Sequence, residues 1–315
     1  MLEQLKQDLC TSEQFRARRS PGVKKEFYAY ISAFLNERGW QGRADGDFKQ
    51  ITNLIFGDER TAKVILTAHY DTSKTGYTAP NFYVTSQIGY AADWVIGVGI
   101  LGVVFGGAAA WWKKKGPLAA AGWIAAMAAY TAASFTVNNK FNFNDNTSGC
   151  IALLGIADAI ARQRPDLRGQ IAIVFTDQEE NGVRGAKKLN KQLLGSLSPE
   201  DLSKKLLLNF DCVGGRDPLF RLYTRSQGLD IARQVRALSP REDFLIHETN
   251  HFPSDSHPFK AFPALSFISV KAAKFPPKLG LEKLGDTHTK RDNVLDTGMV
   301  QEYVDLAVRF LGEYL

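Results

Sequence analysis

Continuous apolar runs alternate with segments of helical period along most of the chain. The unbroken stretches at 62–68 (AKVILTA) and 171–176 (IAIVFT) are typical of strands buried on both faces. Two helices are expected within residues 1–40, separated by a Ser-Pro-Gly break at 20–22. The alternation predicts an α/β fold around a largely parallel sheet. Further strands are expected at 48–56, 205–210 and 264–270, and further helices at 148–161, 185–194, 227–237 and 299–315.

One segment departs from this pattern. Residues 94–112 and 117–137 are two uncharged runs of 19 and 21 residues, separated by a Lys-Lys-Lys-Gly turn. Each run is long enough to cross a bilayer, which takes about 20 residues of helix. Three tryptophans stand where interfacial anchors are expected, namely Trp94, Trp111 and Trp112. A transmembrane hairpin is therefore expected at 91–137, with membrane contact through residues 94–137. A soluble Ala- and Gly-rich hairpin that packs on the domain or on a second subunit is the alternative.

The hairpin would divide the chain into a discontinuous domain, residues 1–90 plus 138–315, and an insertion. Because a hairpin returns the chain to its starting side, both parts of the domain must lie on one side of the membrane. The charged N-terminus has no signal-peptide core and the three cysteines form no disulfide pattern, which favours the cytoplasm. The lysines of the turn favour the opposite side. We expect a multi-pass membrane protein with a cytoplasmic domain, and a soluble cytoplasmic protein is the alternative.

Composition and charge exclude few classes of protein. The chain has 315 residues, of which 44% are hydrophobic and 23% charged, as in ordinary globular proteins. The net charge is +6, and Lys113, Lys114 and Lys115 supply half of it. No concentrated basic face is left for a nucleic acid, so none is expected as a partner. The sequence gives no basis for an oligomeric state.

Acids and histidines gather in five short motifs that follow expected strands or precede expected helices. Open α/β sheets bind ligands at the carboxyl ends of their strands, and acids and imidazoles are the ligands of zinc. Taken singly, each motif also has a plain structural explanation, such as a core histidine or a helix cap at Asp145. The motifs are His69-Tyr70-Asp71, 144–149 (NDNTSG), 177–182 (DQEENG), Asn209-Phe210-Asp211 and 287–292 (THTKRD).

Taken in order, these motifs resemble metallopeptidase family 28, the zinc aminopeptidases and glutamate carboxypeptidases. The resemblance covers nearly the whole chain apart from 91–137. It implies a three-layer α/β/α zinc-exopeptidase-like fold around a mixed, mostly parallel sheet. The segments that carry it are HYDTS, NDNTSG, DQEENGVRGA, NFDCVGG and HTKRD, together with SDSHPF at 254–259.

The resemblance also implies a site for two zinc ions, with cobalt or manganese as substitutes. Asp145 would bridge both ions. His69 and Asp211 would complete one ion, and Glu180 and His288 the other. Carboxylates crowded in this way would repel one another strongly without cations.

Two further roles follow from the resemblance. Asp71 would orient His69, because a carboxylate can fix the tautomer of a ligating imidazole. Glu179 would be the general base that takes a proton from the water between the ions and passes it to the leaving amine. The function implied is that of an exopeptidase, most simply an aminopeptidase that removes N-terminal residues from peptides.

Two other functions remain open. Glutaminyl cyclases share this fold but are acyltransferases that typically bind a single zinc ion. A catalytically inactive membrane scaffold or receptor is the other alternative, although such a protein would be expected to have lost ligands. All five ligands are present in the sequence, which favours the hydrolase.

Overall fold

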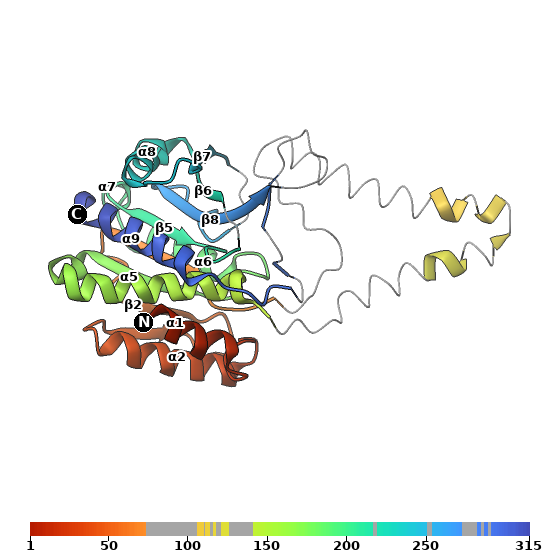
Figure 1. Cartoon of the computed structure of the whole chain (residues 1–315), viewed down its shortest axis with the longest axis horizontal. Helices are drawn as coiled ribbons and strands as arrows, with labels where there is room; N and C mark the ends of the chain where they lie inside the picture. The colour runs from red at the N-terminus through yellow and green to blue at the C-terminus, as the bar shows by residue number, and fades with distance from the viewer. Residues whose placement is uncertain are drawn as a thin grey trace.

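The computed structural model describes residues 1–73, 141–216, 219–250, 254–272 and 291–315, with shorter pieces at 106–109, 111–113, 116–117, 121–125, 282–284 and 287–288 (Figure 1). The strands are β1 (Gly42–Asp45), β2 (Asn53–Phe56), β3 (Val64–His69), β4 (Ile171–Thr176), β5 (Leu206–Phe210), β6 (Leu219–Thr224), β7 (Leu245–Glu248), β8 (Ala264–Ala272) and β9 (Glu282–Lys283). The α-helices are α1 (Leu2–Lys6), α2 (Pro21–Asn36), α5 (Gly149–Gln163), α6 (Arg184–Ser196), α7 (Pro199–Ser203), α8 (Leu229–Leu238) and α9 (Thr297–Tyr314).

The strands form one mixed sheet in the order β1-β2-β4-β3-β5-β8-β6-β7, and β9 pairs with β8. The four neighbouring strands β4, β3, β5 and β8 are mutually parallel. Antiparallel pairing begins on either side of this group, between β2 and β4 and between β6 and β8. The predicted α/β fold around a mixed sheet is confirmed, and the parallel strands lie at its centre.

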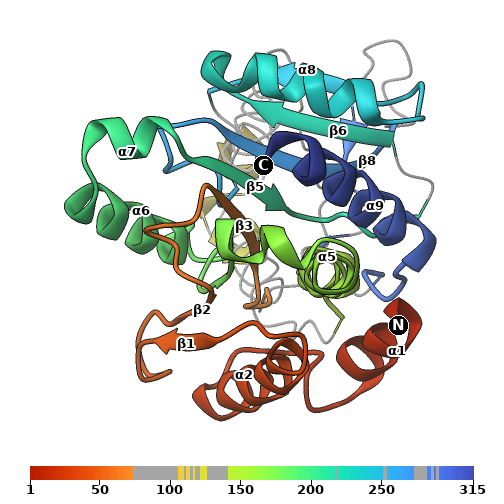
Figure 2. The same ribbon diagram turned by 90° about the vertical axis from the view of Figure 1, so that its left-hand side faces the viewer.

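Helices cover both faces of the sheet. Successive side chains of a strand point to opposite faces, so Val64 and Leu66 join one apolar cluster and Ile65 joins another. The larger cluster packs beneath α5 and α9, and the smaller one includes Leu189 and Leu193 of α6. Figure 2 shows α5 and α9 on one side of the central strands and α6 and α7 on the other. Burial on both faces explains why these strands are continuously apolar in sequence.

The parallel centre of the sheet places three chain segments at one edge. β3 ends at His69, β4 ends at Thr176 and β5 ends at Phe210. Because β4, β3 and β5 are parallel neighbours, the residues that follow them emerge together at their carboxyl ends. All three strands lie within two residues of their predicted positions.

Several strands differ from the prediction. Of the expected strand at 48–56 only Asn53–Phe56 is extended, as β2, and its partner β1 was not predicted. The two strands are joined by a turn in which Gly46 and Phe48 have positive φ angles of 152° and 66°. β6 was not predicted, because Arg221 interrupts its apolar run. That arginine is buried and paired with Glu282. β7 was also missed, because it is short and only partly buried.

The expected membrane hairpin at 91–137 lies mostly outside the described residues. In the part of the chain that is described, no helix is long and apolar enough to cross a membrane. A span needs about 20 apolar residues in one helix. The prediction of a multi-pass membrane protein anchored through residues 94–137 is therefore corrected.

The two-faced core predicts a contrast between two leucines of α6. Leu189 is fully buried, whereas Leu194 is 48% exposed. Leu189→Ala should lower the free energy of unfolding by about 2–5 kcal/mol, because it leaves a cavity in the smaller cluster. Leu194→Ala, the matched control, should change it by less than about 0.5 kcal/mol. Urea denaturation of both variants measures the difference, and equal effects would contradict the assigned packing.

Candidate metal centre

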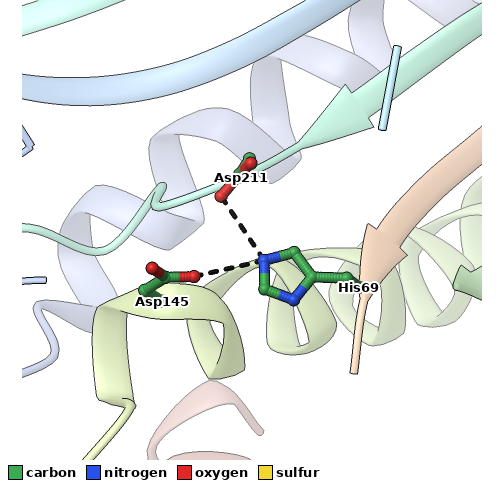
Figure 3. Close-up of side chains that lie close together, drawn as sticks. All are labelled: His69, Asp145 and Asp211. Carbon is green, nitrogen blue, oxygen red and sulfur yellow. Dashed lines mark ion pairs between the residues drawn. The ribbon is translucent and has the colours of Figure 1, made fainter. Parts of the chain in front are cut away.

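Two groups of potential metal ligands meet at the carboxyl ends of β3, β4 and β5. One group is His69, Asp145 and Asp211, and the other is Asp145, Glu180 and His288. Within each group the ligand atoms lie within 4.8 Å of one another. Figure 3 shows the first group, in which one ring nitrogen of His69 faces both carboxylates.

Asp145 belongs to both groups because its two oxygens face different histidines. Its Oδ1 lies 3.1 Å from Nε2 of His69, and its Oδ2 lies 2.9 Å from Nε2 of His288. The same nitrogen of His288 lies 3.0 Å from Oε2 of Glu180, and that of His69 lies 3.7 Å from Oδ1 of Asp211. Ligands of one tetrahedral zinc ion lie about 3.4 Å apart, given bonds of about 2.0–2.1 Å. The spacing therefore suits two adjacent cations that share Asp145.

The backbone is unusual beside these side chains. Gln178, Cys212 and His288 have positive φ angles of 55°, 56° and 57°. A left-handed conformation costs energy for a residue with a Cβ atom, and such residues cluster at functional sites. Gln178 directly precedes the paired glutamates and Cys212 directly follows Asp211. The peptide bond between Asp145 and Asn146 is cis.

Asp292 holds the loop that carries Asp145. The backbone N–H groups of Asn144 and Asp145 donate to its carboxylate at 2.8 and 3.1 Å. The side-chain oxygen of Asn144 accepts from the N–H of Gly214 at 2.8 Å, which joins this loop to the segment after β5. The side chain of Asn144 thus supports the site by holding the backbone of Gly214.

Asp71 lies between His69 and the paired glutamates. Its carboxylate accepts hydrogen bonds from the backbone N–H groups of Glu179 and Glu180, at 3.0 and 3.4 Å. Its Oδ1 is 3.6 Å from Nδ1 of His69, and its backbone carbonyl is 3.2 Å from the same nitrogen. Glu179 turns its Oε2 to within 3.9 Å of the other ring nitrogen of His69. Asp71 therefore couples the position of the histidine to that of both glutamates.

A chain of hydrogen bonds orients Asp211 from the far side. The hydroxyl of Ser254 donates to Oδ2 of Asp211 at 2.7 Å, and the side-chain amide of Asn209 donates to that hydroxyl at 2.7 Å. The next residue, Asp255, is fully buried and accepts from the hydroxyl of Thr176. Its other oxygen has no hydrogen-bond partner among the described residues.

Burial and the crowded charges together raise the pKa values of two histidines and one glutamate of the site. Burial lowers the pKa of His69, but hydrogen bonds to Asp145 and Asp211 outweigh burial and raise it well above the ordinary value. Burial also lowers the pKa of His288, and acidic neighbours again raise it well above normal. Burial raises the pKa of Glu179 well above its usual range, and the charge of Asp211 adds to that shift. Protons are thus favoured on these groups wherever no other cation is bound.

The donor set fits divalent cations. Three carboxylates and two imidazoles form the two ligand groups, and Oε1 of Glu180 is buried with no hydrogen-bond partner in the described structure. A buried acceptor without a donor is costly, and a bound cation would satisfy it. Carboxylate oxygen and imidazole nitrogen are also the ligand types that zinc takes.

Comparison with known proteins identifies the family of this chain. The model of peptidase family M28 matches residues 134–308, which is more than half of the chain. The chain belongs to peptidase family M28. A comparison with curated protein sequences finds no match.

Solved structures of similar fold include both hydrolases and a cyclase. Glutaminyl cyclase from Porphyromonas gingivalis is 18% identical, with a TM-score of 0.58 over 93% of this chain and 91% of that one. The LapA aminopeptidase of Legionella pneumophila is 13% identical, with a TM-score of 0.60 over 99% of this chain and 69% of that one. A Zn-dependent exopeptidase from Parabacteroides distasonis is 16% identical, with a TM-score of 0.58 over 92% and 89%. At these identities the likeness concerns the fold.

The structure brings together all the residues that the sequence singled out. The five predicted ligands form the two groups, and Asp71 and Glu179 lie beside them. The contributions of Asp255 and Asp292 were not predicted, although Asp255 stands in SDSHPF and Asp292 in HTKRD. Arg18, which donates to the carbonyl of Tyr70 and the hydroxyl of Thr147, was not predicted either, because the sequence offers no local signal for it.

The pKa shifts predict how the stability of the metal-free protein depends on pH. Burial raises the pKa of Asp255 from 3.8 to about 7, so its contribution to stability is fully present below about pH 4 and is lost as the pH rises to about 7. The contributions of His69 and His288, whose pKa values are also raised, are lost as the pH rises beyond 6.5. The pKa of Asp145 is lowered, so its contribution is lost only below 3.8.

The melting temperature of the metal-free protein should therefore fall as the pH is raised from 5 to 8. Zinc should raise that temperature more at the upper end, because ion binding displaces protons. Asp255→Asn should flatten the part of the slope below pH 7. Thermal melts with a chelator and with excess zinc test this, and a metal-free protein whose stability increased with pH would contradict the assigned charges.

Proposed function

We propose that this chain is a zinc-dependent exopeptidase that binds two ions, and specifically an aminopeptidase. The observation that carries the proposal is Asp145, whose two oxygens face two histidines while Glu179 lies within 3.9 Å of one of them. Membership of peptidase family M28 supports a hydrolase. Two proteins of similar fold, an aminopeptidase and a Zn-dependent exopeptidase, support zinc and the exopeptidase reaction.

In this proposal five side chains hold the ions, and the catalytic domain is formed by residues 1–90 plus 138–315. His69 and Asp211 serve one ion, Glu180 and His288 serve the other, and Asp145 serves both. A pair of bound divalent cations supplies Lewis acidity, which polarises a substrate carbonyl and makes water more acidic. Cobalt or manganese is expected to support the same chemistry.

Glu179 is the proposed general base. Its side chain is 15% exposed and lies within 3.9 Å of the imidazole of His69, whereas Glu180 turns toward His288. Burial and the nearby acids raise the pKa of Glu179, which suits a carboxylate that takes a proton from the attacking water. The same carboxyl group then gives the proton to the leaving amine. Asp71 holds the backbone N–H of Glu179 and keeps this side chain in reach of the site.

A glutaminyl cyclase-like acyltransferase is the second candidate. The supporting observation is that a glutaminyl cyclase shares the fold over nine-tenths of both chains. Cyclisation of N-terminal glutamine would use the same acids to move protons. An enzyme with a single zinc ion needs only one ligand group. Because the group of His69, Asp145 and Asp211 is complete beside the group of Glu180 and His288, two ions are favoured, and therefore the hydrolase.

Glu179→Gln tests the assignment of the base. This change keeps the size of the side chain but removes its ability to accept a proton, so hydrolysis should fall about 10²–10⁴-fold. Metal content should stay at the wild-type value, because Glu179 belongs to neither ligand group. The measurements are the turnover of aminoacyl p-nitroanilides and zinc per chain by mass spectrometry.

Glu180→Gln is the matched control on the neighbouring residue, and it should lose one ion together with activity. A wild type that holds one ion and cyclises N-terminal glutamine would replace the peptidase with the acyltransferase. Full activity in Glu179→Gln would remove Glu179 from the mechanism.

A further inference from the structure

The segment that leads into α2 places three cationic side chains against the loops of the metal centre. Arg18 donates to the carbonyl oxygen of Tyr70, next to His69. Arg19 donates to the carbonyls of Thr72 and Ser73 in the same loop. Lys24 pairs with Asp177, which directly follows β4 and precedes the paired glutamates. One short stretch of chain, outside the residues matched by the family model, thus reaches several ligand loops.

Arg18 is distinct among the three because it contacts two ligand loops at once. Its side chain is fully buried and lies 5.0 Å from the ring of Phe27. One terminal nitrogen donates to the hydroxyl of Thr147 at 3.0 Å, and the other donates to the carbonyl of Phe15 at 2.8 Å. Thr147 stands two residues after Asp145 and passes the contact on to the carbonyl of Asn142 at 2.7 Å.

The partners of Arg18 are neutral oxygens, so its charge does not serve a simple ion pair. Burying a charge without a hydrogen-bonded counter-ion is costly. Burial lowers the pKa of Arg18, and the charge of Asp71 partly offsets that shift from a distance. What the guanidinium adds is its rigid fork, which fixes three acceptors in one geometry.

We propose that Arg18 is a positioning residue of the metal centre, which sets the distance between His69 and Asp145 by tying the Tyr70 carbonyl to Thr147. It touches neither the ions nor the substrate. The role concerns mainly the site of His69, Asp145 and Asp211, because two of its ligands, His69 and Asp145, stand beside the contacts of Arg18. The other site shares only Asp145 with these loops and takes Glu180 and His288 from elsewhere.

Zinc titration of the metal-free protein against a competing chelator tests this role. Two binding steps are expected for the wild type, and they are assigned with His69→Ala and His288→Ala. In Arg18→Met the step that His69→Ala removes should weaken about tenfold or more, as for other side chains that orient metal ligands. The other step should weaken less, because only one of its ligands, Asp145, stands beside a contact of Arg18.

Two further variants keep the test decisive. Thr147→Val removes one acceptor of Arg18 with little change in volume, and it should weaken the same step severalfold even where Arg18→Met folds poorly. Arg38→Met is the matched control, because Arg38 binds Asp158 and the carbonyl of Phe34 away from the site. This control should lower the melting temperature and leave both zinc steps unchanged.

The role of Arg18 is overturned if Arg18→Met and Thr147→Val both bind zinc as the wild type does. A folded Arg18→Met that loses both steps equally would also overturn it. The inference rests on the proposed metal-dependent function, but the titration separates the two. A wild type that binds two ions and turns over no peptide would overturn the reaction alone, whereas unchanged binding in the variants would overturn the role of Arg18 alone.

Discussion

Negative charge concentrated at one edge of the sheet is the constraint on which the rest of the site depends. Asp145, Glu179, Glu180 and Asp211 converge there, and burial makes their mutual repulsion strong. Such a cluster needs cations, in the form of protons on His69 and His288 or of bound metal. Its position follows from the parallel pairing of β4, β3 and β5, which brings three chain segments to the same edge. The sheet therefore brings the charged side chains together, and the surrounding loops must keep them in position.

The need to hold these charges in place explains features of the loops that the apolar core does not require. The left-handed backbone at Gln178, Cys212 and His288 turns each loop at or close to a metal-binding residue. Asp292 and Asp71 bind backbone N–H groups on either side of the cluster, so acids that are not ligands fix the positions of those that are. Arg18 adds a buried cationic side chain that joins the loop of Tyr70 to that of Thr147. Positions are thus set by loops supported from several distant parts of the sequence.

The sequence predicts the centre of the molecule better than its margins. β3, β4 and β5 are buried on both faces, so their apolar runs are unambiguous, and the motifs at their ends contain three of the five ligands, His69, Glu180 and Asp211. β6 escaped because the buried Arg221 breaks its pattern, a tertiary contact that no local rule anticipates. Arg18 escaped for a similar reason: its partners lie 52 and 129 residues away. The two uncharged runs at 94–112 and 117–137 are each long enough for a membrane span, yet length and composition alone do not establish one.

Anomalous diffraction at the zinc edge, from crystals of the zinc-loaded protein, examines the shared role of Asp145 most directly. Two peaks are expected, one beside His69 and Asp211 and the other beside Glu180 and His288, with one carboxylate oxygen of Asp145 on each. The peaks should lie about 3.5–4 Å apart, the usual spacing of two-metal hydrolytic sites. A single peak at full zinc occupancy, or two ions that do not share Asp145, would contradict the two-ion centre proposed for this chain.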